Sequence, residues 1–325
     1  MGKHYLITGG AGFIGSNLIR TLFKEQPGIR ITCIDNFDPF YPADLKQFNI
    51  RDFKSNPDFC FLYVDIAASS AEDLSDSISH DVDVIIHLAA KAGVWPSVQN
   101  PVPYQQVNVI GLQNILEFAR SREIRQFIFG SSSSVYGINP HFPWKEGEES
   151  LPISPYAMTK LAGEMLGHVY SKLFDLRFIA LRFFTVYGTS QRPDLAIHKF
   201  MKAILTGKPI TMYGDGSTSR DYTYVDDIVN GIISSITYDK SAFEIINLGN
   251  HQPVMLMELI QALEEVTGKK AVLEKLPEQP GDVQKTFADI SKAKRILGYH
   301  PSTGLSEGLK KFYNWFVENQ SLLMK

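Results

Sequence analysis

Cysteine is scarce in this sequence. Only Cys33 and Cys60 occur among 325 residues, and neither stands in a Cys-x-x-Cys or Cys/His spacing. Such spacings are typical of metal centres and of the disulfide frameworks of small secreted proteins. We therefore expect no metal site and no disulfide, and we expect a protein that works in the reducing cytoplasm.

Long apolar runs are also lacking. No stretch of the chain approaches the run of about 18 apolar residues that a membrane span needs. Residues 1–5 lead straight into a strand pattern, without the charged and apolar regions of a signal peptide. We expect neither a membrane association nor a secretory leader.

Charge of one sign does not dominate. The chain has 32 Lys and Arg residues against 35 Asp and Glu residues, a net charge of -3, and it contains no basic run. A protein that follows a phosphate backbone needs a basic patch, so nucleic acid is not an expected partner. The 44% of hydrophobic residues can bury a sizeable core. The length favours one large unit with a smaller unit attached, and hence a cleft.

Short apolar runs alternate with amphipathic stretches in the first half of the chain. The runs predict strands at residues 4–8, 31–35, 60–64, 84–88, 126–131 and 178–181, and the amphipathic stretches predict helices at residues 15–24, 103–120 and 154–174. Strands joined by crossover helices form a parallel sheet that is covered on both faces. The predicted fold class is α/β, a doubly wound (Rossmann) sheet with a smaller C-terminal α/β lobe.

The boundary between the two units stays open. The pattern becomes less regular after residue 181, so we assign residues 1–181 to the main domain and mainly residues 182–325 to the second lobe. Residues 225–236 and 245–248 have the pattern of elements that return to the main sheet.

A glycine-rich turn follows the first predicted strand. Gly9, Gly12 and Gly15 form a GxxGxxG turn that leads into a helix, and glycines there let the backbone approach a pyrophosphate at the helix N-terminus. Asp35 ends the second strand twenty residues after Gly15, where a carboxylate accepts from ribose hydroxyls and repels a 2′-phosphate. A glycine turn alone can be merely tight, but this order predicts NAD rather than NADP.

A second carboxylate lies beyond the third predicted strand. Asp65, followed by Ile66, comes directly after the run at residues 60–64. This position can bring a carboxylate to the adenine amino group. It fits a helix cap or a turn equally well on spacing alone, so both interpretations stay open.

Tyr156 and Lys160 are four residues apart at the start of a predicted helix, so their side chains project from the same face. The phenol of a free tyrosine has a pKa of about 10, so it is a poor base at neutral pH. A neighbouring ammonium and a positive nicotinamide both favour the phenolate. Such a pair alone is more often a solvated helix face. The serine run at residues 131–134 decides the interpretation, because it ends a strand at the sheet edge where ligands of this architecture bind.

Together these motifs resemble an extended short-chain dehydrogenase/reductase. They are TGGAGFIG at residues 8–15, DN at 35–36, HLAA at 87–90, SSSSVYG at 131–137 and YAMTK at 156–160. Within that superfamily the chain is similar to the nucleotide-sugar epimerases, and most narrowly to the UDP-glucuronate 4-epimerases. The narrower hints are DNFDPFYPADLK at 35–46, AGVWPSVQNP at 92–101, RFFTVYGTSQRPDLA at 182–196, DGSTSRDYTYVDDI at 215–228 and QPGDVQKTFAD at 279–289.

The resemblance implies roles for individual residues. Ser132 would be the hydroxyl partner, Tyr156 the base, and Lys160 its electrostatic support and a ribose contact. The expected cofactor contacts are Gly9, Gly12, Phe13, Ile14, Gly15, Asp35, Asn36, Asp65, Ile66, Ala89, Ala90, Lys91, Asn108, Ser131, Tyr156, Lys160 and Phe183. The expected nucleotide-sugar contacts are Ser97, Ser132, Ser133, Ser134, Tyr156, Thr185, Arg192, Tyr213, Arg220 and Asp282. The arginine fork suits diphosphate or carboxylate, although Arg192, Arg220 and Asp282 also fit surface-ion or turn positions.

The resemblance also implies a reaction. Tyr156 takes the proton of the sugar's 4-hydroxyl while NAD+ takes the hydride from carbon 4, the 4-keto sugar rotates, and hydride and proton return. Relatives that eliminate water or a carboxyl group usually carry acidic residues where this chain has Ser133 and Ser134. Neither lyase reaction has its expected helper, so we predict epimerisation.

The motifs indicate the reaction more clearly than they indicate which sugar is the substrate. Glucuronate-specific relatives commonly read AGVR where this chain reads AGVW, ending in Trp95, and GPWGRPD where residues 188–194 read GTSQRPD. Loss of an arginine at position 95 removes a charge, which favours a neutral UDP-hexose or UDP-N-acetylhexosamine as the alternative to UDP-glucuronate. Trp95 can instead pack under the sugar or fill the interface between the lobes.

Three classes of function remain: a UDP-sugar 4-epimerase, a lyase that dehydrates or decarboxylates a nucleotide sugar, and a non-catalytic NAD-binding scaffold. A scaffold has no need for Ser132, Tyr156 and Lys160 together, so it is the least favoured. The helices expected at residues 103–120 and 154–174 suggest the two-helix face by which relatives form homodimers. A single chain can also cover such a pair.

Overall fold

The computed structural model describes residues 2–78, 81–277 and 283–324 of the chain. Within these residues, seven parallel strands form the central sheet: β1 (His4–Thr8), β2 (Arg30–Asp35), β3 (Phe59–Tyr63), β4 (Val84–His87), β5 (Gln126–Ser132), β6 (Arg177–Phe183) and β11 (Phe243–Leu248). Their order is β11-β6-β5-β4-β1-β2-β3, and each neighbouring pair runs parallel. This doubly wound sheet confirms the predicted fold class.

The sheet grows in two directions from β1. This strand pairs with β2 on one side and with β4 on the other. At such a switch point the loops that follow the two strands part, and a crevice opens at the carboxyl edge of the sheet. Gly9, which follows β1, and Leu88, which follows β4, lie at this edge.

Side chains on the strands are buried on both faces of the sheet. On β5, Phe127 and Phe129 belong to one core, whereas Ile128 belongs to the other. The two phenylalanines pack against Phe178 of β6, with ring centroids 5.2 and 5.5 Å apart. A parallel sheet that is covered on two faces requires apolar runs of this kind, without polar alternation.

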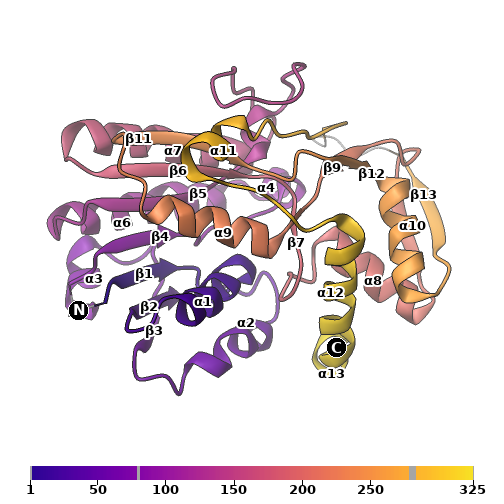
Figure 1. The fold of residues 1–325 in the computed structure, drawn as a ribbon, viewed down its shortest axis with the longest axis horizontal. Helices are drawn as coiled ribbons and strands as arrows, with labels where there is room; N and C mark the ends of the chain where they lie inside the picture. The colour runs from indigo at the N-terminus through magenta and orange to yellow at the C-terminus, as the bar shows by residue number, and fades with distance from the viewer. Residues whose placement is uncertain (1, 79–80, 278–282, 325) are drawn as a thin grey trace.

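Helices cover both faces of the sheet (Figure 1). One core takes residues of α1 (Phe13–Glu25) and α9 (Val225–Ile236), and the other takes residues of α3 (Ala71–Ser77), α6 (Gly111–Ser121) and α7 (Pro155–Leu173). The helices therefore lie where crossover connections of a doubly wound sheet place them.

The helix predicted over residues 103–120 is interrupted in the structure. A short α5 (Val102–Gln105) is followed by a π-helical turn (Gln106–Ile110), and only then does α6 begin. π-helical turns occur frequently at functional sites, and Val107 within this one lines the pocket described below. Hydrophobic periodicity does not reveal one extra residue in a turn.

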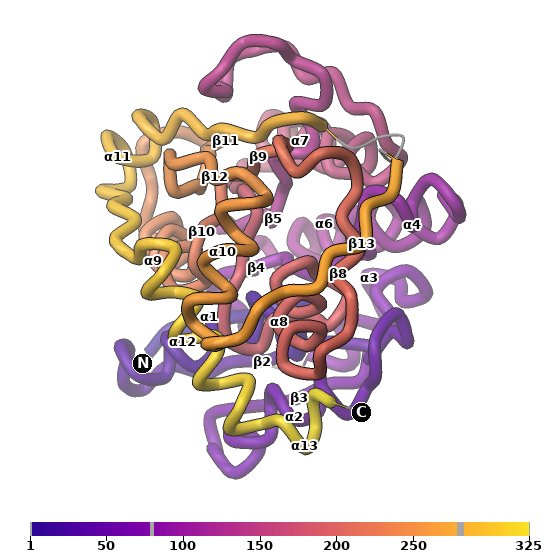
Figure 2. Tube along the Cα trace, turned by 90° about the vertical axis from the view of Figure 1, so that its right-hand side faces the viewer, coloured from indigo at the N-terminus to yellow at the C-terminus, as the bar shows by residue number. Residues whose placement is uncertain are grey.

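The C-terminal part adds a smaller lobe, which lies on the right in Figure 1 and faces the viewer in Figure 2. It contains α8 (Ala196–Thr206), α10 (Leu256–Thr267), α12 (Leu305–Glu318), the parallel pair β8 (Pro209–Tyr213) and β13 (Val272–Leu276), and the antiparallel pair β9 (Ser219–Asp221) and β12 (Pro253–Met255). Leu259 and Phe312 of this lobe belong to the same buried cluster as Ile7 of β1. A shared core therefore attaches the lobe to the sheet.

The remaining elements are short. They are α2 (Ala43–Ile50), α4 (Val94–Gln99), α11 (Ser291–Leu297), α13 (Gln320–Leu323), the 3-10 helices η1 (Arg51–Phe53) and η3 (Ser133–Tyr136), and the parallel pair β7 (Val186–Tyr187) and β10 (Thr223–Tyr224). Strand β11 lies at one edge of the main sheet, so residues beyond 181 also build that sheet. None of the helices in the described ranges is long and apolar enough to cross a membrane.

Candidate active site

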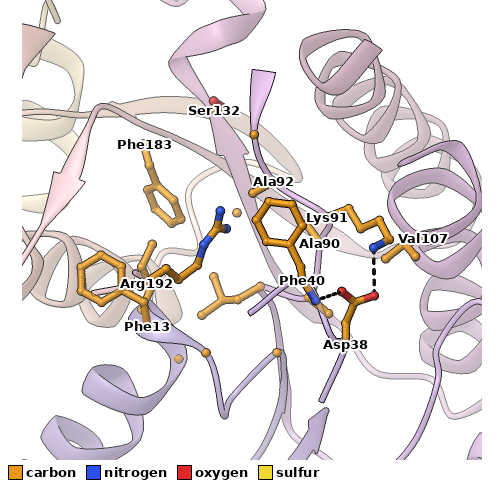
Figure 3. A pocket seen from close by; sticks show the side chains of 18 of the residues that line it. Phe13, Asp38, Phe40, Ala90, Lys91, Ala92, Val107, Ser132, Phe183 and Arg192 are labelled. Atoms are coloured by element: carbon orange, nitrogen blue, oxygen red, sulfur yellow. Dashed lines mark hydrogen bonds and ion pairs between the residues drawn. The ribbon is translucent and has the colours of Figure 1, made fainter. Parts of the chain in front are cut away.

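A pocket of about 470 Å³ lies at the carboxyl edge of the sheet. Its walls come from the turns after β1, β2, β3, β4 and β5, from the π-helical turn, from the start of α7, and from the segment 183–195 that leads into the lobe. Figure 3 shows side chains from these segments gathered around it, with Phe13 at one side and Asp38 at another. The crevice expected at the switch point is therefore present.

The glycine turn after β1 forms one wall of the pocket. Gly9 has a positive φ of 68°, and a Cβ atom there would lie 2.7 Å from the backbone nitrogen of Ala89. A Cβ atom on Gly15 would lie 2.5 Å from the carbonyl oxygen of Gly9. Helix α1 begins after Gly12 without a side-chain cap, so its first N–H groups stay available at the pocket. Such a helix end binds anions.

Asp35 ends β2 beside this turn and is 8% exposed. Burial raises the pKa of its carboxyl group, and Lys46 with its ammonium 3.8 Å away lowers it. The backbone N–H of Phe37 donates to the carboxylate at 2.9 Å. These partners hold the carboxylate at the tip of the strand, where it lines the pocket.

The loop after Asp35 also lines the pocket, and sequence reasoning assigned no site residue in it beyond Asn36. Asp38 pairs with Lys91 at 2.9 Å (Figure 3). Phe40 and Tyr41 lie 5.3 and 6.0 Å from the guanidinium carbon of a residue far along the chain, Arg192. The sequence contains one signal for this loop, namely Asp and Asn residues that favour turns. In the structure Asp35, Asn36 and Asp38 each accept from the backbone N–H two residues on, as in Asx turns.

The start of α7 is fixed by serine side chains. Ser154 caps the helix by accepting from the N–H of Ala157 at 3.2 Å. Pro155 has no N–H, and the N–H of Tyr156 donates to Ser97 Oγ at 3.1 Å. The first N–H groups of the helix therefore all have partners, which is what a helix start needs. This arrangement places Tyr156 firmly at the pocket wall.

Tyr156 and Lys160 meet the end of β5. The hydroxyl of Ser132 donates to the phenol oxygen of Tyr156. Lys160, which is 4% exposed, donates from Nζ to the carbonyl oxygen of Gly130 at 2.7 Å. The predicted trio Ser132, Tyr156 and Lys160 thus lies together at one wall of the pocket.

Burial shifts both pKa values of this pair toward the neutral forms. It raises the pKa of Tyr156, which the hydrogen bond from Ser132 and then the charge of Arg192 lower. The pKa of Lys160 falls to about 8, because burial lowers it by more than the carboxylate of Glu164 raises it. We expected Lys160 to supply the charge that favours the phenolate. In the structure Arg192 is the cation that lowers the pKa of Tyr156.

The other serines of the run extend the hydroxyl network. Ser134 Oγ donates to Ser132 Oγ at 2.8 Å, and Ser132 in turn donates to Tyr156. Ser133 also lines the pocket. This wall can therefore hold a hydroxyl or carbonyl oxygen and move a proton at the phenol, which is general acid–base chemistry.

A protein-family model described as GDP-mannose 4,6 dehydratase matches residues 6–312 of the chain. The chain belongs to this family. It is 39% identical over 323 residues to UDP-glucuronate 4-epimerase of Thermodesulfobacterium geofontis, with 98% of each chain covered. The predicted resemblance to nucleotide-sugar epimerases is confirmed.

Solved structures are similar as well. UDP-glucuronic acid 4-epimerase of Bacillus cereus, in complex with UDP-glucuronic acid and NAD, is 39% identical with a TM-score of 0.91, and 97% of this chain and 99% of that chain are covered. UDP-N-acetylglucosamine 4-epimerase of Methanobrevibacter ruminantium is 31% identical with a TM-score of 0.89, and 98% and 99% are covered. The family model that matches the chain carries the name of a dehydratase, whereas these relatives of the chain are named as epimerases.

Most of the residues predicted for the site line the pocket of this family member. They are Gly9, Gly12, Phe13, Ile14, Gly15, Asp35, Asn36, Asp65, Ile66, Ala89, Ala90, Lys91, Ser131, Ser132, Ser133, Ser134, Tyr156, Lys160, Phe183, Thr185 and Arg192. Asp65 accepts from the N–H of Ala67, as a turn residue does, and it lines the pocket too. Both interpretations of Asp65 therefore remain compatible with its position.

Four predicted contacts lie outside the pocket wall. Ser97 is 0% exposed and supports Tyr156, as described above. Asn108 accepts from the N–H of Lys91 and donates to its carbonyl oxygen, so it holds a wall residue in place. Tyr213 is 38% exposed at the end of β8, and Arg220 donates to the carbonyl oxygens of residues 219 and 284. Asp282 lies outside the described residues.

Ser97→Ala tests the support of the α7 start. The substitution leaves the N–H of Tyr156 buried without its acceptor, so we expect the free energy of unfolding to fall by about 1–2 kcal/mol. Chemical denaturation measures this change. Ser171→Ala on the same helix is the matched control, because Ser171 only donates to the carbonyl oxygen of His168. Equal losses in the two variants would contradict the assignment.

Proposed function

We propose that this chain catalyses NAD-dependent epimerisation of a UDP-sugar at carbon 4, with UDP-glucuronate as substrate and UDP-galacturonate as product. The observation that carries the proposal is a single pocket that joins the turn at Gly9 and the carboxylate of Asp35 to Ser132, Tyr156 and Lys160. The relatives support it, because the Thermodesulfobacterium protein is named UDP-glucuronate 4-epimerase and the Bacillus structure holds UDP-glucuronic acid and NAD.

The residues at one end of the pocket fit NAD. Gly9 and Gly15 leave open the space that a Cβ atom would fill, and the uncapped start of α1 offers N–H groups to a pyrophosphate. The carboxylate of Asp35 is placed for ribose hydroxyls and against a 2′-phosphate. NAD, when bound, supplies the acceptor for the hydride of carbon 4, and its positive ring favours the phenolate of Tyr156.

At the other end, Tyr156 acts as the base. Its phenolate takes the proton of the 4-hydroxyl, while the Ser132 hydroxyl holds the same oxygen by a hydrogen bond. Lys160 keeps its ammonium in the buried wall to hold a ribose hydroxyl of the cofactor, and the charge of Arg192 lowers the pKa of the phenol. When the 4-keto sugar presents its opposite face, the hydride would return to carbon 4 from the bound cofactor while Tyr156 returns the proton to the oxygen, and the configuration at carbon 4 is inverted.

The serines at positions 133 and 134 favour epimerisation over elimination. Loss of water or of a carboxyl group from a 4-keto sugar is assisted by an acidic side chain near carbon 5. The acidic residues that line the described pocket are Asp35, which ends β2, and Asp38 and Asp65, which follow β2 and β3; all three lie at the proposed cofactor end. Ser134 instead donates to Ser132.

Arg192 is the group suited to the uronate carboxylate. Its Nε and Nη2 donate to the Asp194 carboxylate at 2.9 and 2.6 Å, and the guanidinium projects into the pocket in Figure 3. A guanidinium has five donors, so its remaining N–H groups are available to a second carboxylate. Residues 182–325, which include Arg192, mainly form the nucleotide-sugar side of the cleft.

Trp95 bears on the alternative of a neutral sugar. It lies in α4, is 36% exposed, and is not among the residues that line the pocket, although its neighbour Val94 is. The missing arginine at position 95 therefore removes a charge outside the pocket wall, whereas the charge of Arg192 lies within it. This placement favours the uronate over a neutral hexose.

Tyr156→Phe tests the mechanism. The variant keeps the ring but removes the base, so we expect kcat to fall at least about 100-fold while NAD stays bound. Proton NMR of the UDP-sugars and the NAD content of the purified protein measure the two effects. Tyr170→Phe is the matched control, since Tyr170 is a buried tyrosine of the same helix outside the pocket. Turnover by Tyr156→Phe at the wild-type rate would refute the mechanism.

Arg192→Met tests the choice of sugar. Loss of a buried charged hydrogen bond costs about 2–5 kcal/mol, so we expect kcat/KM for UDP-glucuronate to fall at least about 30-fold. Activity on UDP-glucose, which has no carboxylate, is expected to fall less, through loss of the Arg192 charge that lowers the pKa of Tyr156. Arg125→Met is the control, because Arg125 pairs with Asp175 in an exposed position. An equal loss on both sugars would mean that Arg192 does not read the carboxylate.

We also propose that two copies of the chain pair through α7. Four apolar side chains on this helix are 40–67% exposed: Met158, Met165, Val169 and Leu173. Ile110, the last residue of the π-helical turn that precedes α6, is 52% exposed as well. Met165, Val169 and Leu173 are four residues apart, so they lie along one face of α7. Exposed apolar side chains on one face mark an association site, and a two-fold axis lets the same surface cover itself.

Val169→Lys tests this pairing. A charge in the centre of the apolar surface is expected to shift the protein from dimer to monomer in sedimentation equilibrium, because the buried ammonium would lack a partner. Val317→Lys on α12 is the matched control, since Val317 is 43% exposed on another surface. A monomeric wild-type protein would refute the proposed dimer.

A further inference from the structure

A buried ion pair lies directly behind the proposed site. Glu164 of α7 and Arg182 of β6 are 0% and 2% exposed. Arg182 donates from Nε to one carboxylate oxygen at 2.9 Å and from Nη2 to the other at 2.8 Å. Neither residue lines the pocket, and the chemistry proposed above uses neither.

Stability alone gives little reason to keep this pair. Two charges lose their hydration in the core, and a buried ion pair is often no more stabilising than well-packed apolar side chains of similar volume. The guanidinium is also incompletely used, because Nη1 of Arg182 has no hydrogen-bond partner among the described residues. The other contacts of Glu164 indicate what the pair does.

Glu164 continues a row that begins with the catalytic residues. Tyr156, Lys160 and Glu164 are four residues apart on α7, so they lie along one face of the helix. Each of them contacts one of the residues 130–132 at the end of β5. The contacts are Tyr156 with the Ser132 hydroxyl, Lys160 Nζ with the Gly130 carbonyl oxygen at 2.7 Å, and Glu164 with the Ser131 hydroxyl, which donates at 2.5 Å.

We propose that Glu164, with Arg182 as its counterion, is a positioning residue that holds the end of β5 against α7 and so sets the Ser132 hydroxyl against the phenol of Tyr156. The inference rests on the catalytic roles proposed above. One contact at Gly130 fixes the distance between strand and helix, and a second at Ser131 also fixes the direction in which Ser132 leaves the strand. The negative charge of Glu164 acts, in addition, on Lys160 one turn away.

Two pKa values connect Glu164 to the chemistry. Burial lowers the pKa of Lys160 to about 8, and the Glu164 carboxylate raises it. Burial raises the pKa of Tyr156, and the Ser132 hydrogen bond lowers it. Loss of the carboxylate therefore lowers the pKa of Lys160, and displacement of Ser132 raises that of Tyr156. Three other titratable or charged groups face Tyr156 or Lys160, and a substitution of Glu164 leaves them in place. They are His87 from β4, Tyr104 from α5 and Arg192 from the segment after β7.

The pH dependence of kcat should consequently narrow from both sides. Tyr156 must lose its proton to act as a base, so its higher pKa moves the acid limb to higher pH. Lys160 must keep its proton to donate to a ribose hydroxyl of the cofactor, so its lower pKa moves the alkaline limb to lower pH. A substitution that only loosens the fold lowers activity at every pH and moves neither limb.

The test uses the full chain with NAD, after thermal melting has shown that each variant is folded. Glu164→Gln keeps the shape of the side chain and removes its charge. The double variant Glu164→Leu with Arg182→Met removes both charges, which leaves no unpaired ion in the core, and it carries the test where the single variant does not fold. Asp227→Asn is the matched control. Asp227 is another buried carboxylate, 2% exposed, which accepts from the N–H groups of residues 302 and 303 and does not line the pocket.

We expect both Glu164 variants to lose at least about tenfold in kcat at the optimum and each limb to move by about one pH unit. Asp227→Asn is expected to keep both limbs in place. Limbs at the wild-type pH in both Glu164 variants would overturn the proposal.

A second readout needs no turnover. The ultraviolet absorbance of the Tyr156 phenolate in the NAD complex, taken as the difference from Tyr156→Phe, is expected to titrate at higher pH in the Glu164 variants. An unchanged titration would also overturn the positioning role. A wild-type protein that epimerises no UDP-sugar would refute the proposed function instead, and the phenolate titration would still decide the role of Glu164.

Discussion

The contact between the start of α7 and the end of β5 is the constraint on which the rest of the site depends. Tyr156 and Lys160 lie on the helix, and Ser132 is the last residue of the strand. The helix start cannot slide without losing hydrogen bonds, because Ser97 and the Ser154 cap accept its first N–H groups. Small displacements of reacting groups reduce the rate by large factors. The proposed chemistry therefore depends on how precisely this contact aligns Ser132 with Tyr156 and Lys160.

Burial makes the same contact electrostatically demanding. It raises the pKa of Tyr156 and lowers the pKa of Lys160 to about 8, so both groups are pushed toward their neutral forms, whereas the proposed mechanism needs a phenolate and an ammonium. Ser132 and Arg192 lower the pKa of Tyr156, and Glu164 raises the pKa of Lys160, so each opposes the effect of burial. Fixed partners of this kind stabilise charge without reorganising during the reaction, which is how active sites commonly lower barriers.

Local patterns were sufficient to predict much of the fold and of the pocket wall. The strand that ends in Thr8, the glycine turn after it and the spacing of Tyr156 and Lys160 each depend on residues within a few positions of one another, and a short window of sequence records them. The supports of these residues are not local. Ser97 and Asn108 were expected to touch ligands, and the structure adds that they bond to Tyr156 and Lys91, respectively, which no local pattern indicated. No periodicity predicts that Phe40 would lie against Arg192, since only the folded sheet and lobe bring them together.

The central claim is that hydride leaves carbon 4 and returns to it within one site. The most direct measurement is proton NMR of the products formed by the wild-type protein from UDP-glucuronate carrying deuterium at carbon 4. The account predicts UDP-galacturonate that retains the deuterium at carbon 4, in equilibrium with the labelled substrate. A UDP-pentose with released carbon dioxide, or a UDP-galacturonate whose carbon 4 carries hydrogen from solvent, would contradict it.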